Sequence, residues 1–380
     1  MKKILALLWI CGACLGLLVY NLVVSVPTPV TDAPMEATAT RQTEPKDTAP
    51  TEPAKPKVQV RVCNDQPQRQ QAWDQIAKQY SDATGVEVVI LEGSGENATL
   101  LTTDSMDGLD AQDLSGTAAY AQLADMNLTL TKDGKVCGLA AQLNAFGLMY
   151  NTDLLIAAGY TPGDIYDLNS FATVVQGLSK QGYTAFSGRG LNDGVAAMLA
   201  SLPGNIRTLA DLWVTNTAEG SEDALSRFLS GKTVFYLGSI EEYDTITAGG
   251  VKNLGILPVY LDDQLPQAQS LCVTAERYWC VSGENEAEVT AAMAFLDFLV
   301  VPDENGVVPV DTLQMLAPYR QATWFSNPLE GILRQDLTAG KGYLVCNSGS
   351  QPLDDFVAAL NAYAKDPTDE NWSRVEEAKK

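Results

Sequence analysis

The sequence predicts an α/β fold whose mass divides into two lobes, and the first pattern that indicates this follows residue 57. Val58–Val62 alternates apolar and polar residues, as a half-buried strand does. Gln68–Thr84 repeats its large apolar residues at helical spacing before Gly85, and Val86–Leu91 is a second, more apolar strand. A β-α-β opening of this kind favours a parallel sheet that is covered by crossover helices.

The same alternation of helices and strands continues along the chain. Helices are expected at 170–180, 221–230 and 286–301, and strands at 233–237, 254–258 and 279–281. The roughly 320 residues after position 57 exceed what one hydrophobic core usually holds, so we expect two α/β lobes. Because sites in open α/β sheets lie beyond the carboxyl ends of strands, a ligand is expected in the cleft between the lobes.

The N-terminus has the features of a membrane segment. Lys2 and Lys3 precede residues 4–26, which carry no charge and are long enough to cross a bilayer. We favour an uncleaved anchor, with a cleaved signal peptide or a lipid anchor at Cys14 as alternatives, since Gly12–Cys14 resembles the end of a lipobox. All three place the rest of the chain on the extracytoplasmic face of the membrane.

Residues 27–57 are rich in Pro, Thr and Ala and contain almost no large apolar side chain. Such a segment cannot bury enough surface to offset the entropy of ordering it. We expect a disordered stalk that is dispensable for folding.

Charge and the absence of histidine exclude several functions. A formal net charge of -22 repels phosphate backbones and anionic membranes, so a nucleic-acid partner is not expected. No histidine is present, which excludes Ser-His-Asp and Cys-His nucleophiles and HExxH zinc sites. A hydrolase that uses two carboxylates remains formally open, although no acid pair stands out.

Five cysteines lie after the stalk, an odd number that does not form a disulfide framework. Most of them occur in apolar runs, where a free thiol packs as a small hydrophobe. We expect reduced core cysteines, and only Cys272 and Cys280 are spaced closely enough to suggest a hairpin disulfide.

Several segments resemble one protein family in the same order. The most specific is GKVCGLAAQLNAFGLMYNTDL at 134–154, and weaker matches are LSKQGYTAF at 178–186, FLSGKTVFYLGS at 228–239, LGILPV at 254–259 and YWCVS at 278–282. Together they are similar to family 1 extracellular solute-binding proteins, the maltose-binding-protein-like group that serves carbohydrate ABC importers. The resemblance spans about 58–375.

This resemblance implies a two-lobed, periplasmic-binding-protein-like (type II) clamp with a hinge. Lobe I would comprise 58–144 plus 270–315, and lobe II 145–269 plus 316–380. The implied function is delivery of a small polar solute, a sugar or oligosaccharide above all, to an ABC transporter permease. A monomer without catalytic residues, cofactor or metal is expected.

The sequence also departs from the family pattern. The acidic segment of the first lobe is missing, Ile240 stands where many sugar binders place a Trp, and Cys137 replaces a Tyr. These departures leave an alternative open, in which a degenerate binding protein acts as a membrane-tethered sensor or scaffold.

Candidate ligand-binding residues of the first lobe follow its first two strands. Asn64 and Asp65 come directly after Val58–Val62, while Ser94 and Glu96 lie in a glycine-rich loop after the second strand. Polyol sites need such donors and acceptors on rigid strand ends. Asp65 is equally suited to a turn or a helix N-cap, and Glu96 to a solvated loop.

The other candidates belong to the crossing and to the second lobe. Asn144 lies where the chain would pass between lobes, and Arg189 has glycines on both sides that permit close approach to a ligand. Ser239 and Glu242 mark a turn before a helix. Trp324 is the candidate aromatic platform for a sugar ring.

Overall fold

The computed structural model describes residues 58–379 except 94, 96, 107, 188–192, 203, 218–222, 260–270, 340–343 and 346–352. The predicted membrane segment, the stalk, and the candidates Ser94, Glu96 and Arg189 therefore lie outside the described residues. Among those described, no helix combines the length and the apolar character needed to cross a bilayer.

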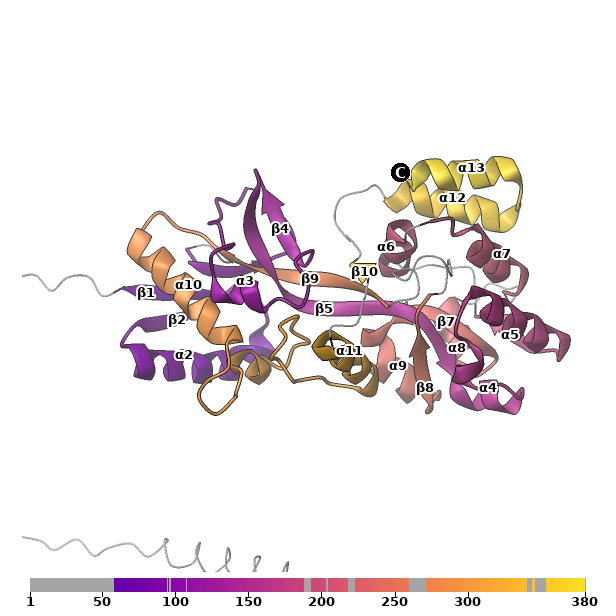
Figure 1. The fold of residues 1–380 in the computed structure, drawn as a ribbon, viewed down its shortest axis with the longest axis horizontal. Helices are drawn as coiled ribbons and strands as arrows, with labels where there is room; N and C mark the ends of the chain where they lie inside the picture. The colour runs from indigo at the N-terminus through magenta and orange to yellow at the C-terminus, as the bar shows by residue number, and fades with distance from the viewer. Residues whose placement is uncertain are drawn as a thin grey trace, which may run out of the picture. The chain divides into compact units, whose positions relative to one another are not determined.

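Strands and helices alternate along the described chain (Figure 1). The strands are β1 (Gln59–Asn64), β2 (Glu87–Glu92), β3 (Leu100–Thr103), β4 (Thr129–Lys132), β5 (Lys135–Asn151), β6 (Thr184–Phe186), β7 (Thr233–Ser239), β8 (Leu254–Leu257), β9 (Cys272–Val281) and β10 (Leu344–Val345).

The α-helices are α2 (Gln70–Thr84), α3 (Ala118–Gln122), α4 (Thr152–Ala157), α5 (Leu168–Lys180), α6 (Asp193–Ser201), α7 (Arg207–Thr215), α8 (Ala224–Leu229), α9 (Tyr243–Ala248), α10 (Glu286–Val300), α11 (Pro328–Ala339), α12 (Leu353–Lys365) and α13 (Asp369–Ala378). Short 3-10 helices are η1 (Pro67–Arg69), η2 (Pro162–Asp164), η3 (Ile240–Glu242) and η5 (Pro309–Leu313).

The predicted β-α-β opening is confirmed. Strand β1 pairs in parallel with β2, and α2 connects them. Trp73, Ile76 and Tyr80 of α2 are buried, as their spacing predicts. Gly85 ends the helix in the left-handed region with φ of 75°, a conformation that glycine adopts without strain.

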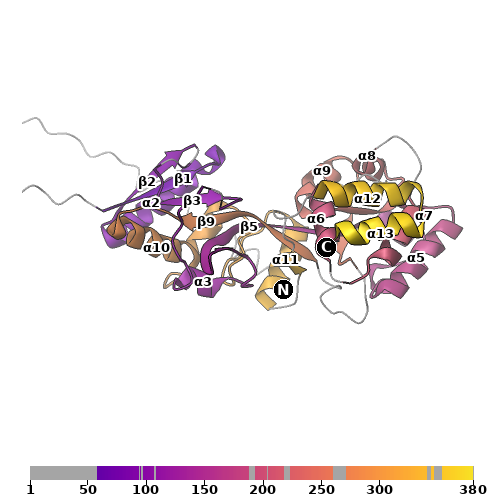
Figure 2. The ribbon, with the colours of Figure 1, turned by 90° about the horizontal axis from the view of Figure 1, so that it is seen from above.

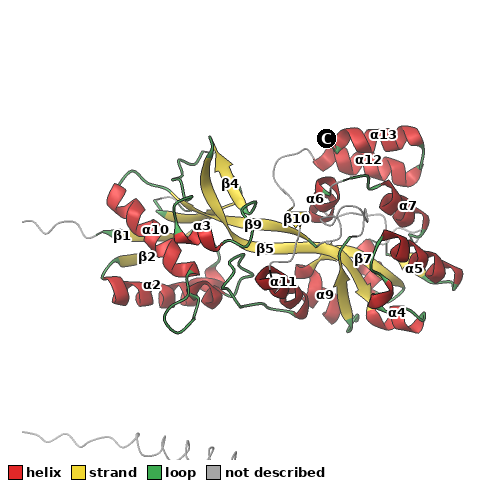
Figure 3. Ribbon diagram, viewed as in Figure 1, coloured by secondary structure: helices red, strands yellow, loops and turns green. Residues whose placement is uncertain are grey.

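The sheet is mixed, whereas the opening alone favours a parallel one. Its order is β2-β1-β3-β9-β5-β7-β6, with β10 on β9 and with β4 and β8 on β5. Strands β5 and β9 run antiparallel to each other, side by side in Figures 1 and 3. Strand β9 begins at Cys272, seven residues before the predicted start, because its first part is fixed by pairing with β5.

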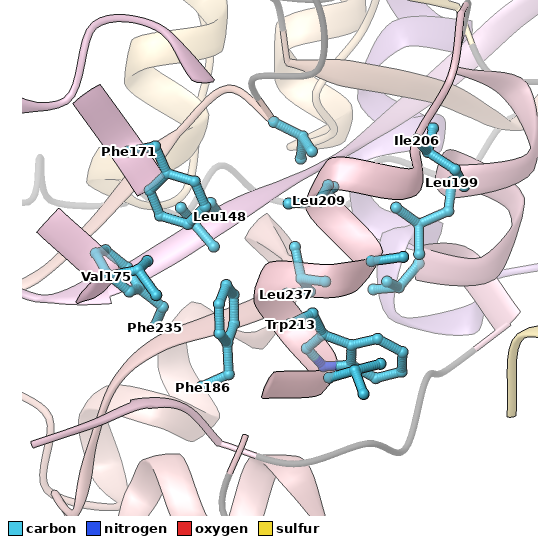
Figure 4. Close-up of a cluster of buried hydrophobic side chains, with 14 of the residues drawn as sticks. Leu148, Phe171, Val175, Phe186, Leu199, Ile206, Leu209, Trp213, Phe235 and Leu237 are labelled. Carbon is cyan, nitrogen blue, oxygen red and sulfur yellow. The ribbon is translucent and has the colours of Figure 1, made fainter. Parts of the chain in front are cut away.

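Three large hydrophobic clusters, and a small fourth one around Cys63 and Cys280, form the interior of the described chain. The β1–β3 core combines Val60, Trp73, Leu100, Leu139, Trp279 and Phe295 with their neighbours. The β6–β7 core is built around Phe171, Phe186, Trp213 and Phe235 (Figure 4). Phe146 and Phe356 also belong to it. The α8–α11 core contains Ala140, Leu143, Phe228, Tyr236, Val273 and Leu333.

Helices cover the strands that build these cores. Rings of α2 and α10 meet in the β1–β3 core, where the Tyr80 and Phe295 centroids lie 5.0 Å apart. Helices α12 and α13 lie side by side in both views, next to α6 and α7 (Figures 1 and 2). Strand β5 supplies side chains to all three cores, so it links the two halves of the described chain.

The cysteine prediction is correct for three of the four cysteines that the structure describes. Cys63, Cys137 and Cys280 are free and buried. It is wrong for Cys272, which is disulfide-bonded. Since Cys280 is free, a bridge between Cys272 and Cys280 is excluded, and the partner lies outside the described residues. The two cysteines lie near opposite ends of one extended strand, which separates their Cα atoms by far more than the roughly 7 Å that a disulfide permits, so spacing in sequence alone was misleading.

We predict that Cys272→Ala lowers the free energy of unfolding by about 2–4 kcal/mol, because it releases a constraint on the unfolded chain. Urea unfolding measures this loss. Cys137→Ala is the matched control, since it removes a buried free thiol and should cost about 1 kcal/mol or less. Equal stabilities of the wild type with and without reductant would refute the prediction.

Candidate functional site

A polar cavity lies at the carboxyl end of β1, inside the half of the chain that contains the β1–β3 core. Its volume is about 20 Å³. The residues that line it are Cys63, Asn64, Asp65, Gln66, Arg69, Trp73, Thr102, Ala141, Gln142, Arg277, Trp279 and Met315. A space of this size accommodates about one water molecule, so a solute of sugar size needs room beyond the cavity itself.

Two predicted site residues lie at this cavity. Asn64 is buried, donates to Gln70 Oε1 over 2.9 Å and accepts from the backbone N–H of Gln66. Asp65 accepts from Arg277 at 2.7 Å and from the Thr102 hydroxyl at 3.1 Å. The alternative role of Asp65 as a helix N-cap is not what the structure shows, since neither η1 nor α2 has a side-chain cap.

The pairing of β5 with β9 brings further polar residues to the cavity. The register shifts on both sides of Gln142, which leaves Ala141 on β5 and Glu276 on β9 unpaired as β-bulges. Bulges of this kind re-aim side chains next to binding sites. Gln142 donates to Glu276 Oε2 over 2.8 Å and accepts from Arg69 over 3.2 Å.

Arg69 connects these groups to the loop after η5. Besides Gln142, it donates to the backbone oxygen of Gln314. Burial lowers the pKa of Arg69, while Asp65 and Glu276 act in the opposite direction, and a guanidinium with such a high intrinsic pKa stays charged. The site thus holds two guanidinium groups, those of Arg69 and Arg277.

Glu241 of η3 reaches the same group of residues. Glu241 as a whole residue is exposed, yet its carboxyl group lies against Glu276 and is partly withdrawn from water. Burial, the hydrogen bond to Glu276 and repulsion from that carboxylate raise the pKa of Glu241 to about 8.

The cavity offers donors besides its charged groups. Trp73 and Trp279 line it edge to face, with centroids 5.7 Å apart. The Nε1–H of Trp279 is buried and has no hydrogen-bond partner among the described residues. Burial is the main cause that raises the pKa of the Cys63 thiol, which keeps it protonated and unreactive at neutral pH.

Two further predicted residues, Asn144 and Ser239, contact each other, and neither of them lines the cavity. The Ser239 hydroxyl donates to Asn144 Oδ1 over 2.8 Å, and the same oxygen accepts from the Ala145 N–H. Both side chains are buried. Glu242 accepts from Ser239 N and from the Tyr236 hydroxyl, which completes a capping box at η3.

Ile240 and Trp324 do not provide a sugar platform at the cavity. Ile240 is buried in the α8–α11 core, and its carbonyl accepts from Asn327. Trp324 is half-buried, and its backbone N–H donates to Asp311. It is not among the residues that line the cavity. Ligand binding by Asn144, Ser239, Glu242 and Trp324 stays a prediction.

The prediction from sequence missed Arg69, Gln142, Glu241, Glu276 and Arg277. A signal existed for two places: Gln142 is a polar residue inside an apolar run, as Asn144 is, and Glu276–Arg277 interrupts the apolar stretch of β9. Arg69 and Glu241 lie in polar surroundings and carry no such signal. In the described part of the chain, no group of three or more acidic or thiol side chains is arranged to hold a metal ion.

Comparison with known proteins identifies the family. The model of the bacterial extracellular solute-binding protein family matches residues 52–306, and the chain belongs to that family. Its class is therefore that of solute-binding proteins of ABC import, which bind a small solute outside the cytoplasm and catalyse no reaction. No curated protein matches the sequence.

Solved structures agree on a periplasmic-binding-protein-like fold. Apo RafE from Streptococcus pneumoniae is 13% identical with a TM-score of 0.66, and the match covers 87% of this chain and 98% of that one. RafE in complex with raffinose gives a TM-score of 0.54 at 13% identity, covering 85% and 98%. The cyclic alpha-maltosyl-1,6-maltose binding protein from Arthrobacter globiformis is 16% identical with a TM-score of 0.64, covering 85% and 98%.

We predict that Asn144→Ala and Ser239→Ala each destabilise the solute-free protein by about 1–3 kcal/mol, because each leaves a buried polar partner unsatisfied. Urea unfolding of both variants and of the double variant measures the coupling, expected at about 0.5–3 kcal/mol. If both variants unfold like the wild type but bind solute more weakly, the two residues contact ligand as the sequence predicts.

Proposed function

We propose that this protein is a two-lobed clamp that binds an uncharged polyol, a sugar or oligosaccharide, and delivers it to an ABC importer. The proposed lobes are 58–144 plus 270–315 and 145–269 plus 316–380. In support, the β1–β3 core draws its residues from the proposed first lobe apart from Ala317, Tyr319 and Ala322, and the β6–β7 core draws them from the proposed second lobe apart from Cys272. Strands β5 and β9 would form the hinge between them.

The charge balance at the cavity is the observation that carries the proposal of an uncharged solute. Arg69 and Arg277 bring two positive charges. Asp65, which lines the cavity, and Glu276, which accepts from the lining residue Gln142, bring two carboxylates. A site without surplus charge gains nothing from an ionic ligand that must first lose its hydration.

The kinds of groups at the cavity also suit hydroxyls. A sugar hydroxyl donates to a carboxylate and accepts from a guanidinium or an indole N–H. Asp65, Arg69 and Trp279 supply these three. Among similar structures, RafE is described in complex with raffinose and another is named for a cyclic maltosyl-maltose, both oligosaccharides.

The proposed binding residues of the first lobe are Asn64 and Asp65, together with Arg69, Gln142 and Trp279. Since the cavity holds about 20 Å³, the solute would extend from it toward the second lobe. Ser94 and Glu96 of the proposed first lobe and Arg189 of the proposed second lobe remain candidates for contacts with the part of the solute outside the cavity.

We predict that a thermal-shift screen finds stabilisation by an oligosaccharide or monosaccharide and none by amino acids or polyamines. A ligand at 100 times its Kd stabilises the folded state by about 2.7 kcal/mol, which raises the Tm by several degrees. Stabilisation only by charged compounds would overturn the proposal. A screen without any hit would favour the alternative of a sensor or scaffold.

The variants Arg69→Gln and Asp65→Asn test whether the solute binds at this cavity. Each should weaken the solute found in the screen by about 1–3 kcal/mol, as measured by calorimetry, because a hydroxyl loses its charged partner. Glu304→Gln, which changes an exposed loop acid, is the matched control and should bind like the wild type.

A further inference from the structure

Three neighbouring strands, β1, β3 and β9, bring Asp65, Thr102 and Arg277 together. Asp65 directly follows β1, and Thr102 lies on β3, which pairs in parallel with β1. Strand β9 pairs antiparallel with β3 and places Trp279 opposite Thr102. Directly opposed residues share a face of the sheet, and so do residues two apart on one strand. Arg277 therefore projects on the same face as Thr102, and all three side chains line the cavity.

Both donors approach the same oxygen of Asp65. The Thr102 hydroxyl donates to Oδ2 over 3.1 Å, and Nη1 of Arg277 lies 2.7 Å from that atom. The other oxygen, Oδ1, accepts no hydrogen bond from the part of the chain that the structure describes. The Asp65 side chain is 24% exposed, so the carboxylate borders the cavity while most of it is withdrawn from water.

Thr102 determines how this carboxylate is oriented. The torsion about the last bond of an aspartate side chain has broad minima, so a single contact leaves the carboxylate plane free to turn. Arg277 alone is such a contact, and its long side chain is 42% exposed. The Thr102 hydroxyl belongs to a short, β-branched side chain on a paired strand, where χ1 is restricted. Together the two donors fix the plane of the carboxylate and thereby the direction in which Oδ1 presents its lone pairs.

The remaining oxygen of Asp65 requires a donor. An ionised carboxylate is only an acceptor, so a hydroxyl can donate to Oδ1 whereas an ether oxygen cannot. Because Arg277 already balances the charge of Asp65, a neutral donor is sufficient. Hydrogen bonds to an ionised group are roughly twice as strong as those between neutral groups, so the direction of Oδ1 matters for affinity.

We propose that Thr102 is a positioning residue of the solute site: with Arg277 it holds Oδ2 of Asp65, so that Oδ1 accepts a hydrogen bond from a hydroxyl of the solute. This role rests on the function proposed above. Thr102 acts through Asp65 and makes no contact of its own with the solute. The site then selects a sugar with a free hydroxyl at this position over one in which that oxygen carries a methyl group.

Unfolding of the solute-free protein tests the contact between Thr102 and Asp65. Thr102→Val keeps the shape of the side chain and removes the hydroxyl, and Asp65→Ala removes the acceptor. We expect Thr102→Val to lower the folding equilibrium constant about tenfold in the wild type, because a hydrogen bond to an ionised group is lost. In the Asp65→Ala background the same change should cost nothing. Equal losses in both backgrounds would refute the contact.

Affinity tests the positioning role, with raffinose and glucose as probes in calorimetric titrations. For the sugar that binds, Thr102→Val should raise the Kd about tenfold, since Asp65 remains but is no longer held in one orientation. Thr102→Ser keeps the hydroxyl and should bind like the wild type. Thr103→Val is the matched control on the same strand: the Thr103 hydroxyl donates to the Ser105 carbonyl and does not line the cavity, so the Kd should not change.

The double variant separates positioning from direct contact. If Thr102 acts through Asp65, Thr102→Val adds no further loss of affinity to Asp65→Ala. A tenfold loss in both backgrounds, or a Thr102→Val protein that binds the sugar like the wild type, would overturn the positioning role and leave the proposed function standing. If neither sugar binds to the wild type, the role in solute binding falls with the proposed function, and the unfolding measurement still decides whether Thr102 holds Asp65.

Discussion

The antiparallel pairing of β5 with β9 is the constraint on which the rest of the structure depends. Strand β5 is 17 residues long and is buried along nearly its whole length, with side chains in all three cores. Strand β4 pairs with its first residues, β9 with its middle, and β7 and β8 both pair with its last part. Each of the three cores includes buried side chains of β5, so none of them would be complete without this strand.

The two bulges in this pairing explain how one strand serves different cores. Leu139 and Ala141 face the β1–β3 core, while Ala140 faces the α8–α11 core. Regular alternation would return Leu143 to the first face, yet it lies in the α8–α11 core with Ala140. The extra residue at Ala141 reverses the alternation, as a one-residue shift must. The same irregularity places Gln142 and Glu276 at the candidate site, so the crossing between cores and the polar site have a common cause.

Local patterns predicted what depends on local structure. Helix α2 with its glycine end, the parallel β1–β2 pair and later elements such as α5, α10 and β7 follow from periodicity and turn residues. Asn144 and Ser239 were both singled out as ligand-binding candidates, but 95 positions separate them, and only the fold shows that they hydrogen-bond to each other. Likewise a bulge depends on the register between two strands, which no single-strand pattern contains.

The proposed preference for an uncharged solute also agrees with the contrast between the charge of the whole chain and that of the site. A net charge of -22 repels anions at a distance, although two guanidinium groups at the cavity would otherwise attract them. Cations are drawn toward the surface, but at the cavity Asp65 is engaged by Arg277, and next to it Glu276 accepts from Gln142 and interacts with Arg69. Any ion that entered would have to displace one of these partners and lose its own hydration. A hydroxyl displaces none of them, since it adds a hydrogen bond to groups whose charges are already balanced.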